Sequence, residues 1–349
     1  VIRKPAHTPV REPQYIRMPN GIPLHVFNAG DGDVVRIDLL FGGGRWHQEL
    51  PLQALFANRM LREGTARFSS GEIAERLDYY GAWLELASAA EYTYLTLYSL
   101  GKYLPETLDV LESVVKEPLY PGKELKVVLE TNVRQFLVNS SKAEFAAGRG
   151  LMNFLYGESH PAGHVLRVED YRRITPEALQ RFYARYYHSA NCSIYLSGRI
   201  DERCLRLVEE HFGQEPFGSG FLPMERMVFQ PCGDAGKTLF LEREGAAQNA
   251  VRMGMLSLNQ RHPDYLKLRV LVTLFGGYFG SRLMGNIREQ KGYTYGITAG
   301  LLPYPGEGVL TISSDTAPEY VQPLVQEVYK EMDRLCNERV SDEELERVR

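Results

Sequence analysis

Residues 42–65 read GGGRWHQELPLQALFANRMLREGT, and this stretch decides the expected fold. Before it, residues 33–42 alternate apolar and polar side chains through Val35, Ile37 and Leu39, which is the pattern of a strand with one buried face. The glycine-rich turn leads into a helical pattern over about residues 50–62, which ends before Gly64-Thr65. The stretch therefore predicts a strand, a tight turn and a helix.

The rest of the first half continues as a mixture of strands and helices. A strand is predicted at 22–28, and the turn Asp31-Gly32-Asp33 predicts that it forms a hairpin with the strand at 33–42. Further strands are predicted at 83–87, 92–100 and 192–196, and further helices at 70–80, 103–117, 122–138, 141–156, 175–187 and 201–211.

A stretch rich in Gly, Pro and Ser, without any sustained period, lies between Gly213 and Ala235 and is typical of a linker. We therefore expect an N-terminal domain at 1–212, a linker at 213–235 and a C-terminal domain at 236–349. The second half restarts with predicted strands at 237–242, 249–257, 294–301 and 307–314, and with helices at 263–275, 281–290 and 318–338. Ser341 and Glu344 then open a capped helix, and the sequence stops inside it.

The order of the second half repeats the opening of the first: two strands, two helices, two strands and then helices. The sequence therefore predicts an α+β protein with two homologous domains, each a mainly antiparallel sheet packed against helices.

Composition excludes several classes of function. Hydrophobic residues make up 44% and charged residues 24%, which is the balance of a soluble globular protein, and no apolar stretch approaches the ~18 residues of a membrane-spanning helix. The formal net charge of −4 gives no electrostatic basis for binding nucleic acid. The four cysteines are scattered without metal-site or disulfide spacing, so we interpret them as free thiols.

Three stretches together resemble the pitrilysin/insulinase family of zinc metallopeptidases, whose active site is an H-x-x-E-H motif on a helix. They occur in the family's order and span nearly the whole chain. The stretches are Gly42–Gly81, His160–His164 with Ile174–Glu177, and Leu274–Tyr295. The resemblance implies a fold like that of the mitochondrial processing peptidase and the LuxS-like metallohydrolases.

The family's zinc-binding positions are changed in this chain. Counted back from Gly64-Thr65, the positions of the two histidines and the catalytic glutamate hold Leu55, Asn58 and Arg59. Zinc needs neutral imidazole or anionic donors, and the attacking water needs a base, so a leucine, an amide and a guanidinium cannot do this work.

The third ligand position of the family is also changed. There a glutamate lies seven residues after another glutamate, and seven residues after Glu124 this chain has Thr131. Glu130 is adjacent, but one step along a helix turns a side chain by about 100°, so it would need a register shift. His160 and His164 have the spacing of a metal pair, but Pro161 and Gly163 between them indicate a loop. We therefore expect no metal in this chain.

One functional pair of the family is retained. The family has an arginine followed seven residues later by a tyrosine, which contact the substrate backbone, and Arg288 and Tyr295 match them. Gly292 between them can adopt the left-handed conformation that ends a helix, so Tyr295 would begin the next strand. Both side chains are hydrogen-bond donors, which suits a peptide carbonyl or the oxyanion formed from it. The alternative is a solvated helix arginine and a core tyrosine.

The resemblance implies a non-catalytic subunit of a heteromeric zinc metallopeptidase. Zinc is expected only in a homologous partner that carries H-x-x-E-H, while Arg288 and Tyr295 bind the peptide substrate. The alternative is a purely structural subunit of the respiratory core-protein type. The sequence leaves open the peptide substrate, a homodimer when the chain is isolated, and the compartment, cytoplasmic or periplasmic.

Overall fold

The computed structural model describes residues 12–30, 32–220, 224–234, 236, 238–242 and 248–348. It divides into two compact units: the described residues of Val1–Thr131 with Arg167–Met227, and those of Asn132–Leu166 with Val228–Arg349. The compact units therefore differ from the expected ranges 1–212 and 236–349, because residues 132–166 pack with the second half of the chain. The boundaries of the duplicated domains themselves stay a prediction.

The first unit contains a six-stranded sheet in the order β1-β2-β6-β3-β5-β4. Its strands are β1 (Gln14–Arg17), β2 (Pro23–Asn28), β3 (Val34–Gly42), β4 (Trp83–Ser88), β5 (Tyr92–Leu100) and β6 (Cys192–Gly198). All neighbouring pairs are antiparallel except β2 and β6, which are parallel. The predicted β2–β3 hairpin is therefore wrong, because β6 returns from far along the chain and pairs with both strands.

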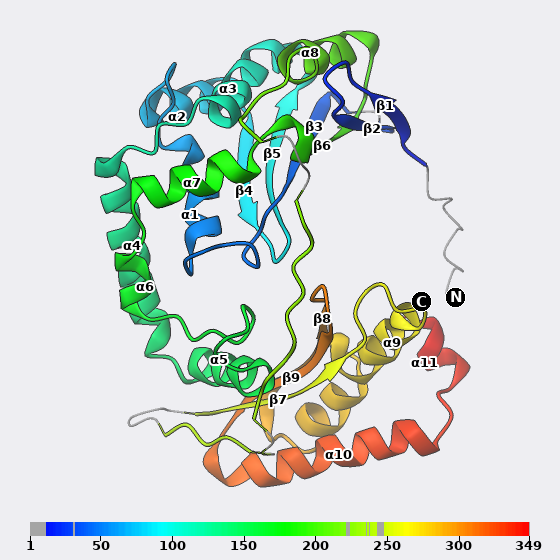
Figure 1. Ribbon diagram of the computed structural model, residues 1–349. Helices are drawn as coiled ribbons and strands as arrows, with labels where there is room; N and C mark the ends of the chain where they lie inside the picture. Colours follow the sequence, from blue (N-terminus) through cyan, green and yellow to red (C-terminus); the bar gives the residue numbers. More distant parts are fainter. Residues whose placement is uncertain are drawn as a thin grey trace. The chain divides into compact units, whose positions relative to one another are not determined.

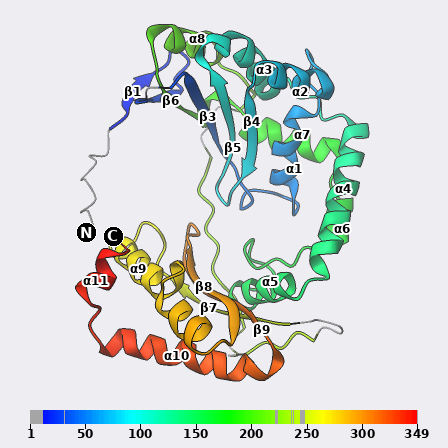
Figure 2. The same ribbon diagram turned by 180° about the vertical axis from the view of Figure 1, so that it is seen from behind.

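Helices cover one face of this sheet (Figures 1 and 2). The helices of the first unit are α1 (Gln53–Arg59), α2 (Ser70–Tyr79), α3 (Leu104–Lys116), α6 (Val168–Arg172), α7 (Pro176–Tyr186) and α8 (Glu202–Phe212), with short 3₁₀ turns η1 (Met60–Arg62), η2 (Gly101–Tyr103) and η3 (Ser189–Asn191). The alternating residues Val35, Ile37, Leu39 and Phe41 of β3 are almost fully buried beneath them. This alternation is the pattern that the sequence predicts for β3.

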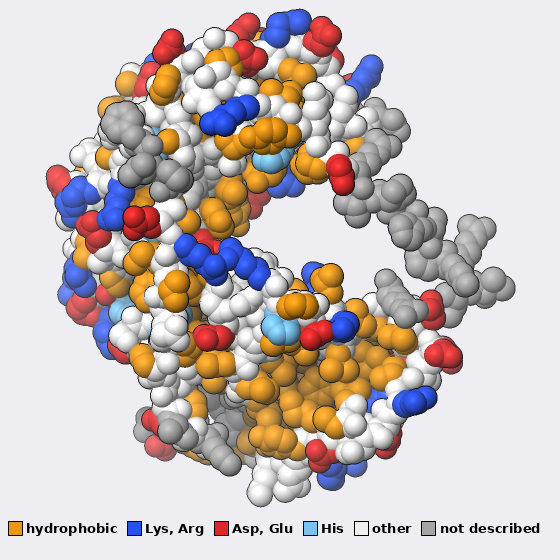
Figure 3. All heavy atoms as spheres, turned by 45° about the vertical axis from the view of Figure 1, so that its right-hand side comes forward, with side chains coloured by type: hydrophobic (Ala, Val, Ile, Leu, Met, Phe, Trp, Pro, Cys, Tyr) orange, Lys and Arg blue, Asp and Glu red, His pale blue; other side chains and the backbone are white. Residues whose placement is uncertain are grey.

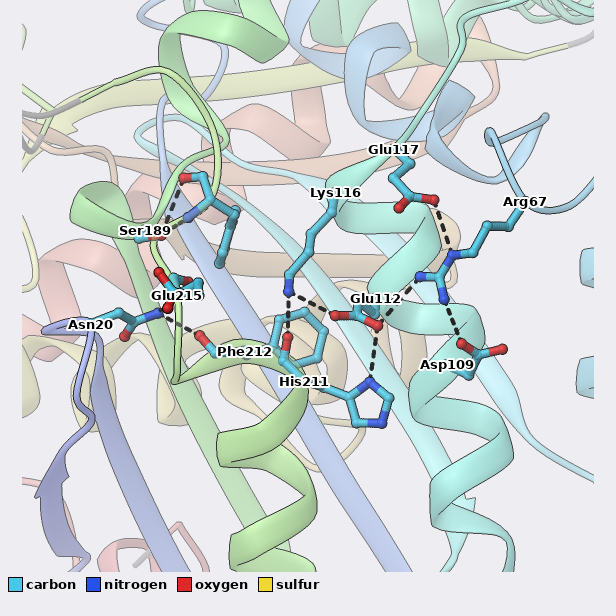
Figure 4. A network of polar contacts seen from close by, with 11 residues as sticks. Asn20, Arg67, Asp109, Glu112, Lys116, Glu117, Ser189, His211, Phe212 and Glu215 are labelled. Carbon is cyan, nitrogen blue, oxygen red and sulfur yellow. Dashed lines mark hydrogen bonds and ion pairs between the residues drawn. The ribbon is translucent and has the colours of Figure 1, made fainter.

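A network of charged side chains ties α3 to its neighbours, as Figure 4 shows. Arg67 bonds the carboxylates of Asp109 and Glu117 at 2.5 and 3.0 Å. Lys116 donates to Glu112 at 2.7 Å and to the carbonyl oxygen of His211 in α8 at 2.6 Å. The network fixes α3 against α8 and against the turn before α2.

The second unit contains a three-stranded antiparallel sheet in the order β7-β9-β8. Its strands are β7 (Asn249–Ser257), β8 (Thr294–Leu302) and β9 (Gly308–Thr316). Its helices are α5 (Ala143–Tyr156), α9 (Tyr265–Val272), the π-helices η4 (Thr273–Gly277) and η5 (Met284–Gln290), the 3₁₀ turn η6 (Pro318–Tyr320), α10 (Val321–Asn337) and α11 (Asp342–Glu346). Helix α4 (Gly122–Ser140) begins in the first unit and ends in the second.

The two faces of the second sheet have different neighbours. The core cluster joins Val272, Ile287 and Val328 of the helices to Ile297 and Ile312 of the sheet. On the opposite face of β7, a side chain added at Gly254 would meet Leu151 of α5 at 3.1 Å. The packing of α5 on β7 explains why residues 132–166 belong to this unit.

The internal repeat is present in the structure. The sequence β3, α1, α2, β4, β5, α3 in the first unit has the counterpart β7, α9, η5, β8, β9, α10 in the second, and the strand orders β3-β5-β4 and β7-β9-β8 correspond. The α+β fold with two homologous halves is thus confirmed. The predicted strand at 237–242 is not formed at 238–242, and residue 237 lies outside the described residues. Among the described residues, none of the helices combines the length and the hydropathy that a membrane span requires.

Candidate functional site

Helix α1 is anchored at its start by a buried glutamine. Leu52, just before the helix, has a left-handed backbone with φ of 71°. The Gln53 side chain accepts a hydrogen bond from the Glu49 amide at 2.8 Å and donates one to the Ala178 carbonyl at 2.7 Å. These bonds fix the orientation of the helix against α7.

Leu55, Asn58 and Arg59, which the resemblance places at the zinc motif, all lie on the helix α1, and a helix is predicted there. Asn58 is 1% exposed, and its amide donates to the Tyr187 hydroxyl at 3.1 Å. Leu55 and Arg59 are half-buried, and the Arg59 guanidinium lies 6.0 Å from the centre of the Phe56 ring. Thus the middle one of the three positions holds the amide of Asn58, which is hydrogen-bonded to Tyr187.

The fourth altered position lies on α4. Thr131 is exposed and is the last residue of the first unit. The start of α4 is tied to α1 by Tyr120, whose fully buried hydroxyl donates to the Ala57 carbonyl at 3.0 Å. The structure therefore holds α1 and the first turn of α4 in one compact unit.

The donor set at these four positions does not fit zinc. Leu55 offers no lone pair, the Asn58 amide is oriented by Tyr187, Arg59 carries a positive charge, and Thr131 offers only a neutral hydroxyl. Among the residues that the structure describes, no three His, Cys, Asp or Glu side chains gather into a group that could hold a metal ion. The predicted loop at His160 is confirmed, and the ring nitrogen of His160 accepts from the amide of Ala162 within it.

Residues 224–226, which we call the strap, cross the turn that precedes α1. The Met224 amide donates to the Asn191 side chain at 2.9 Å, and the Gly43 amide donates to the Met224 sulfur at 2.7 Å. Arg226 forms an ion pair with the nearly buried Glu91 at 3.6 Å. The turn is close-packed, since a Cβ atom added at Gly43, whose φ is +98°, would lie 2.4 Å from the Tyr186 ring.

His47 connects the same turn to the strap. Its Nε2–H donates to the Glu225 carbonyl at 3.0 Å, and its Nδ1 accepts from the Gly44 amide at 3.4 Å. Burial lowers the pKa of His47, so the neutral ring that these two bonds require is favoured at neutral pH. The two bonds occupy both ring nitrogens of His47, so neither nitrogen is available to a metal. His47 therefore has a structural role.

Arg288 lies in the π-helix η5 of the second unit. Gly292 has φ of +67° and donates to the Arg288 carbonyl at 3.1 Å, which confirms the predicted left-handed end of the helix. The Arg288 guanidinium lies 4.5 Å from the centre of the Phe279 ring and donates to Glu289 at 2.5 Å. π-Helical turns are rare and frequently occur at functional sites.

Tyr295 lies in a β-bulge at the start of β8. Thr294 pairs with Thr316 and Ile297 with Ser314, so Tyr295 and Gly296 together lie opposite a single residue. The Thr294 hydroxyl accepts from the Gly296 amide at 3.1 Å and from the Ser314 hydroxyl at 3.0 Å, which holds the bulge in place. Bulges of this kind redirect side chains.

The exposure of Tyr295 decides between the two interpretations of this side chain. Tyr295 is 89% exposed, so it is not the core tyrosine of the alternative interpretation. Figure 3 shows a broad area of hydrophobic side chains on the second unit, and Tyr295 and Phe279 are among the exposed large hydrophobic residues of the chain. Their exposure leaves them accessible to a ligand.

Sequence reasoning missed several residues of these sites. The altered zinc positions belong to the first unit and the Arg288–Tyr295 pair to the second. Phe279 and Glu289 contact Arg288 and lie inside the stretch Leu274–Tyr295, but no role was predicted for either of them. Asn191 and Met224 are distant in sequence from the turn that they hold, so no local pattern predicts them.

Two family models match the chain. Residues 34–146 match a family described as insulinase (peptidase family M16), and residues 173–349 match the peptidase M16 inactive domain. The substrate role of Arg288 and Tyr295 stays a prediction, because these matches concern whole domains.

Curated relatives have corresponding descriptions. The uncharacterized zinc protease YmxG of Bacillus subtilis is 24% identical over 332 residues, which cover 94% of this chain and 79% of the relative. An uncharacterized zinc protease of Mycobacterium tuberculosis is 26% identical over 274 residues, which cover 76% of this chain and 61% of the relative. The chain thus spans less than two thirds of the length of the mycobacterial protein.

Solved structures have the same fold. A structure described as a peptidase M16 inactive domain from Pseudomonas fluorescens is 24% identical, with a TM-score of 0.85 over 96% of this chain and 82% of that chain. A protease from Helicobacter pylori is 15% identical, with a TM-score of 0.82 over 97% of this chain and 83% of that chain. Since the family models match more than half of the chain and both describe one family, this chain belongs to peptidase family M16, the pitrilysin/insulinase family.

Proposed function

We propose that this chain is a non-catalytic subunit of a heteromeric zinc metallopeptidase and that its partner is a homologous chain with an intact H-x-x-E-H motif. The observation that carries the proposal is a contrast within one chain. The four metal positions hold residues that cannot bind zinc. The retained Arg288 lies in a π-helix, and the retained Tyr295 lies in a hydrogen-bonded bulge and is 89% exposed.

Arg288 and Tyr295 have chemistry that suits a peptide backbone. A guanidinium and a phenol both donate hydrogen bonds, and neither needs a base nearby. Donors directed at a carbonyl that becomes an oxyanion typically contribute about 10²–10³ in kcat. In this proposal the partner supplies the metal and the base, and this chain supplies the donors that hold the substrate carbonyl.

A purely structural subunit is the second candidate. This candidate is raised by a fold that this chain shares with a chain of Complex III2 from Candida albicans, at a TM-score of 0.74 and 13% identity over 96% of this chain. Likeness at this identity concerns the fold alone. The structural candidate requires no accessible Arg288–Tyr295 pair, whereas the peptidase candidate does.

Mixing the chain with its H-x-x-E-H partner tests the proposal. Neither chain alone should hydrolyse a quenched fluorescent peptide, and the mixture should do so with one zinc per pair of chains. Both activity and the mass of the complex should be measured, because a structural subunit would form the complex without creating activity. Peptidase activity of this chain alone, with a bound zinc, would contradict the proposal, and so would an inactive complex.

A further inference from the structure

The guanidinium of Arg288 is held by two neighbours with different chemistry. Its central carbon lies 4.5 Å from the centre of the Phe279 ring, well inside the ~6 Å range of a cation–π interaction. Its Nη1 donates to the Glu289 carboxylate at 2.5 Å. One face of the guanidinium is therefore covered by an aromatic ring, and one corner is bonded to a carboxylate.

The turn that carries Phe279 is anchored on both sides. A Cβ atom added at Gly276 would lie 2.7 Å from the Cβ of Ala299, so the end of η4 packs closely on β8. The Ser281 amide donates to the Tyr278 carbonyl at 3.1 Å, which closes the turn before η5. Phe279 lies between these two points and is 67% exposed. The backbone thus places the ring, although the core does not bury it.

The charge of Arg288 is compensated before any ligand arrives. A free guanidinium prefers a carboxylate, because two charge-assisted hydrogen bonds form at once. With Glu289 already bonded to Nη1, a second carboxylate would meet the repulsion of the first. The remaining N–H groups of Arg288 are still donors, and a neutral carbonyl can accept from them without this repulsion.

We propose that Phe279 and Glu289 are positioning residues that adapt Arg288 to the backbone carbonyl of an internal peptide segment and not to a C-terminal carboxylate. Phe279 fixes the plane of the guanidinium, and Glu289 partly compensates its positive charge. The proposal rests on the proposed function, because it assigns a peptide ligand to Arg288. It adds that Arg288 accepts peptides whose backbone continues beyond the bound carbonyl.

The first test concerns the positioning alone and needs no ligand. In the whole chain, the Nε–H proton of Arg288 should show a ring-current shift, assigned by its disappearance in Arg288→Lys. Phe279→Leu keeps an apolar side chain but removes the ring, so the shift should be lost, and Phe279→Tyr should retain it. An unchanged Nε–H resonance in Phe279→Leu would overturn the role of Phe279, whatever the peptidase experiment gives.

The second test compares two forms of one fluorescein-labelled, unstructured peptide of Ala, Ser, Thr and Val, one C-terminally amidated and one with a free carboxylate. The wild-type chain should bind both forms equally, within about twofold. Phe279→Leu should weaken the binding of both forms by about two- to fivefold, which corresponds to the loss of one exposed cation–π interaction. Glu289→Gln should make the free-carboxylate form the tighter ligand, because the guanidinium charge is then uncompensated.

Tighter binding of the free-carboxylate form by the wild-type chain, by tenfold or more, would overturn the proposal. Binding of both forms that Arg288→Ala leaves unchanged, or no binding of either form, would overturn it as well. These outcomes are distinct from failure of the proposed function, which concerns activity with the partner. Melting temperatures of all variants should lie close to that of the wild type, since Phe279 and Glu289 are exposed and Arg288 is only partly buried.

Discussion

Asn191 should be one of the most sensitive residues of the first unit, although it belongs to no motif. Its amide donates to the carbonyl oxygens of Gly42 and Tyr186, both at 2.8 Å, and its carbonyl accepts from the Met224 amide at 2.9 Å. Asn191 is 8% exposed. Replacement by alanine would therefore remove the partner of two carbonyl acceptors and of one amide donor at a buried position.

The magnitude follows from these three bonds. Each intramolecular hydrogen bond contributes about 0.5–1.5 kcal/mol net, so Asn191→Ala should lower the free energy of unfolding of the first unit by about 3 kcal/mol. Gln214→Ala is the matched control, because the exposed Gln214 amide makes a single bond to the side chain of Glu209. The control should change this free energy by less than about 0.5 kcal/mol.

Tryptophan fluorescence during urea unfolding measures this unit specifically. The chain has two tryptophans, Trp46 and Trp83, and both belong to the first unit. If the slope of the unfolding free energy against urea concentration is unchanged, Asn191→Ala should shift the unfolding midpoint to a lower urea concentration. The shift should correspond to the expected loss of free energy. Equal midpoints for Asn191→Ala and Gln214→Ala would refute the reasoning that Asn191 holds the strap on the turn.

Three further predictions follow from the same structure. Gly43→Ala should destabilise the first unit strongly in the same urea assay, because the added Cβ would lie 2.4 Å from the Tyr186 ring at a positive φ, whereas Gly71→Ala meets nothing within 4 Å and should be tolerated. Burial alone would raise the pKa of Glu112, but hydrogen bonds and charges from Lys116 and His211 outweigh it and leave this pKa below its usual value. Because the folded-state pKa is depressed, the stabilisation is present at neutral pH and is lost as the pH falls below about 4, so wild type and Glu112→Gln should differ in urea midpoint at pH 7 and converge in acid. Elemental analysis should find no stoichiometric zinc in the purified chain, and the variant carrying Leu55→His, Asn58→Glu, Arg59→His and Thr131→Glu should gain zinc; a wild-type chain that holds one zinc, lost on mutating α1, would contradict the account.

Local patterns predicted the regular elements well. The alternation of β3 predicted the observed strand, because β3 has a buried face of period two that is visible within a short window. The strand predicted at 249–257 is also observed, as β7. Gly292 was predicted for the same kind of reason, since few residues other than glycine accept a positive φ at the end of a helix. These features depend on neighbours in sequence.

The failures concern interactions between distant segments. The predicted hairpin of residues 22–28 with 33–42 fails because β6, about 150 residues later, pairs with both strands. The position of α5 on β7 depends on the fit of Leu151 to Gly254, which no periodicity predicts. The same holds for Phe279 beside Arg288, because a π-helix and a turn bring the two side chains together. Packing between elements thus decides what the sequence pattern leaves open.

The turnover of the assembled complex with Arg288→Ala in this chain tests the central claim most directly. In the proposed complex, Arg288 belongs to the subunit that is expected to hold no zinc, so a loss of activity on its substitution would not come from disturbed zinc ligands. We expect the variant to bind the partner normally and to lower kcat by at least about tenfold, equivalent to ~1.4 kcal/mol of barrier. Lys291→Ala, in the same turn, is the control and should leave kcat unchanged. A complex of Arg288→Ala that cleaves peptides as fast as the wild-type complex would contradict the account and favour a purely structural subunit.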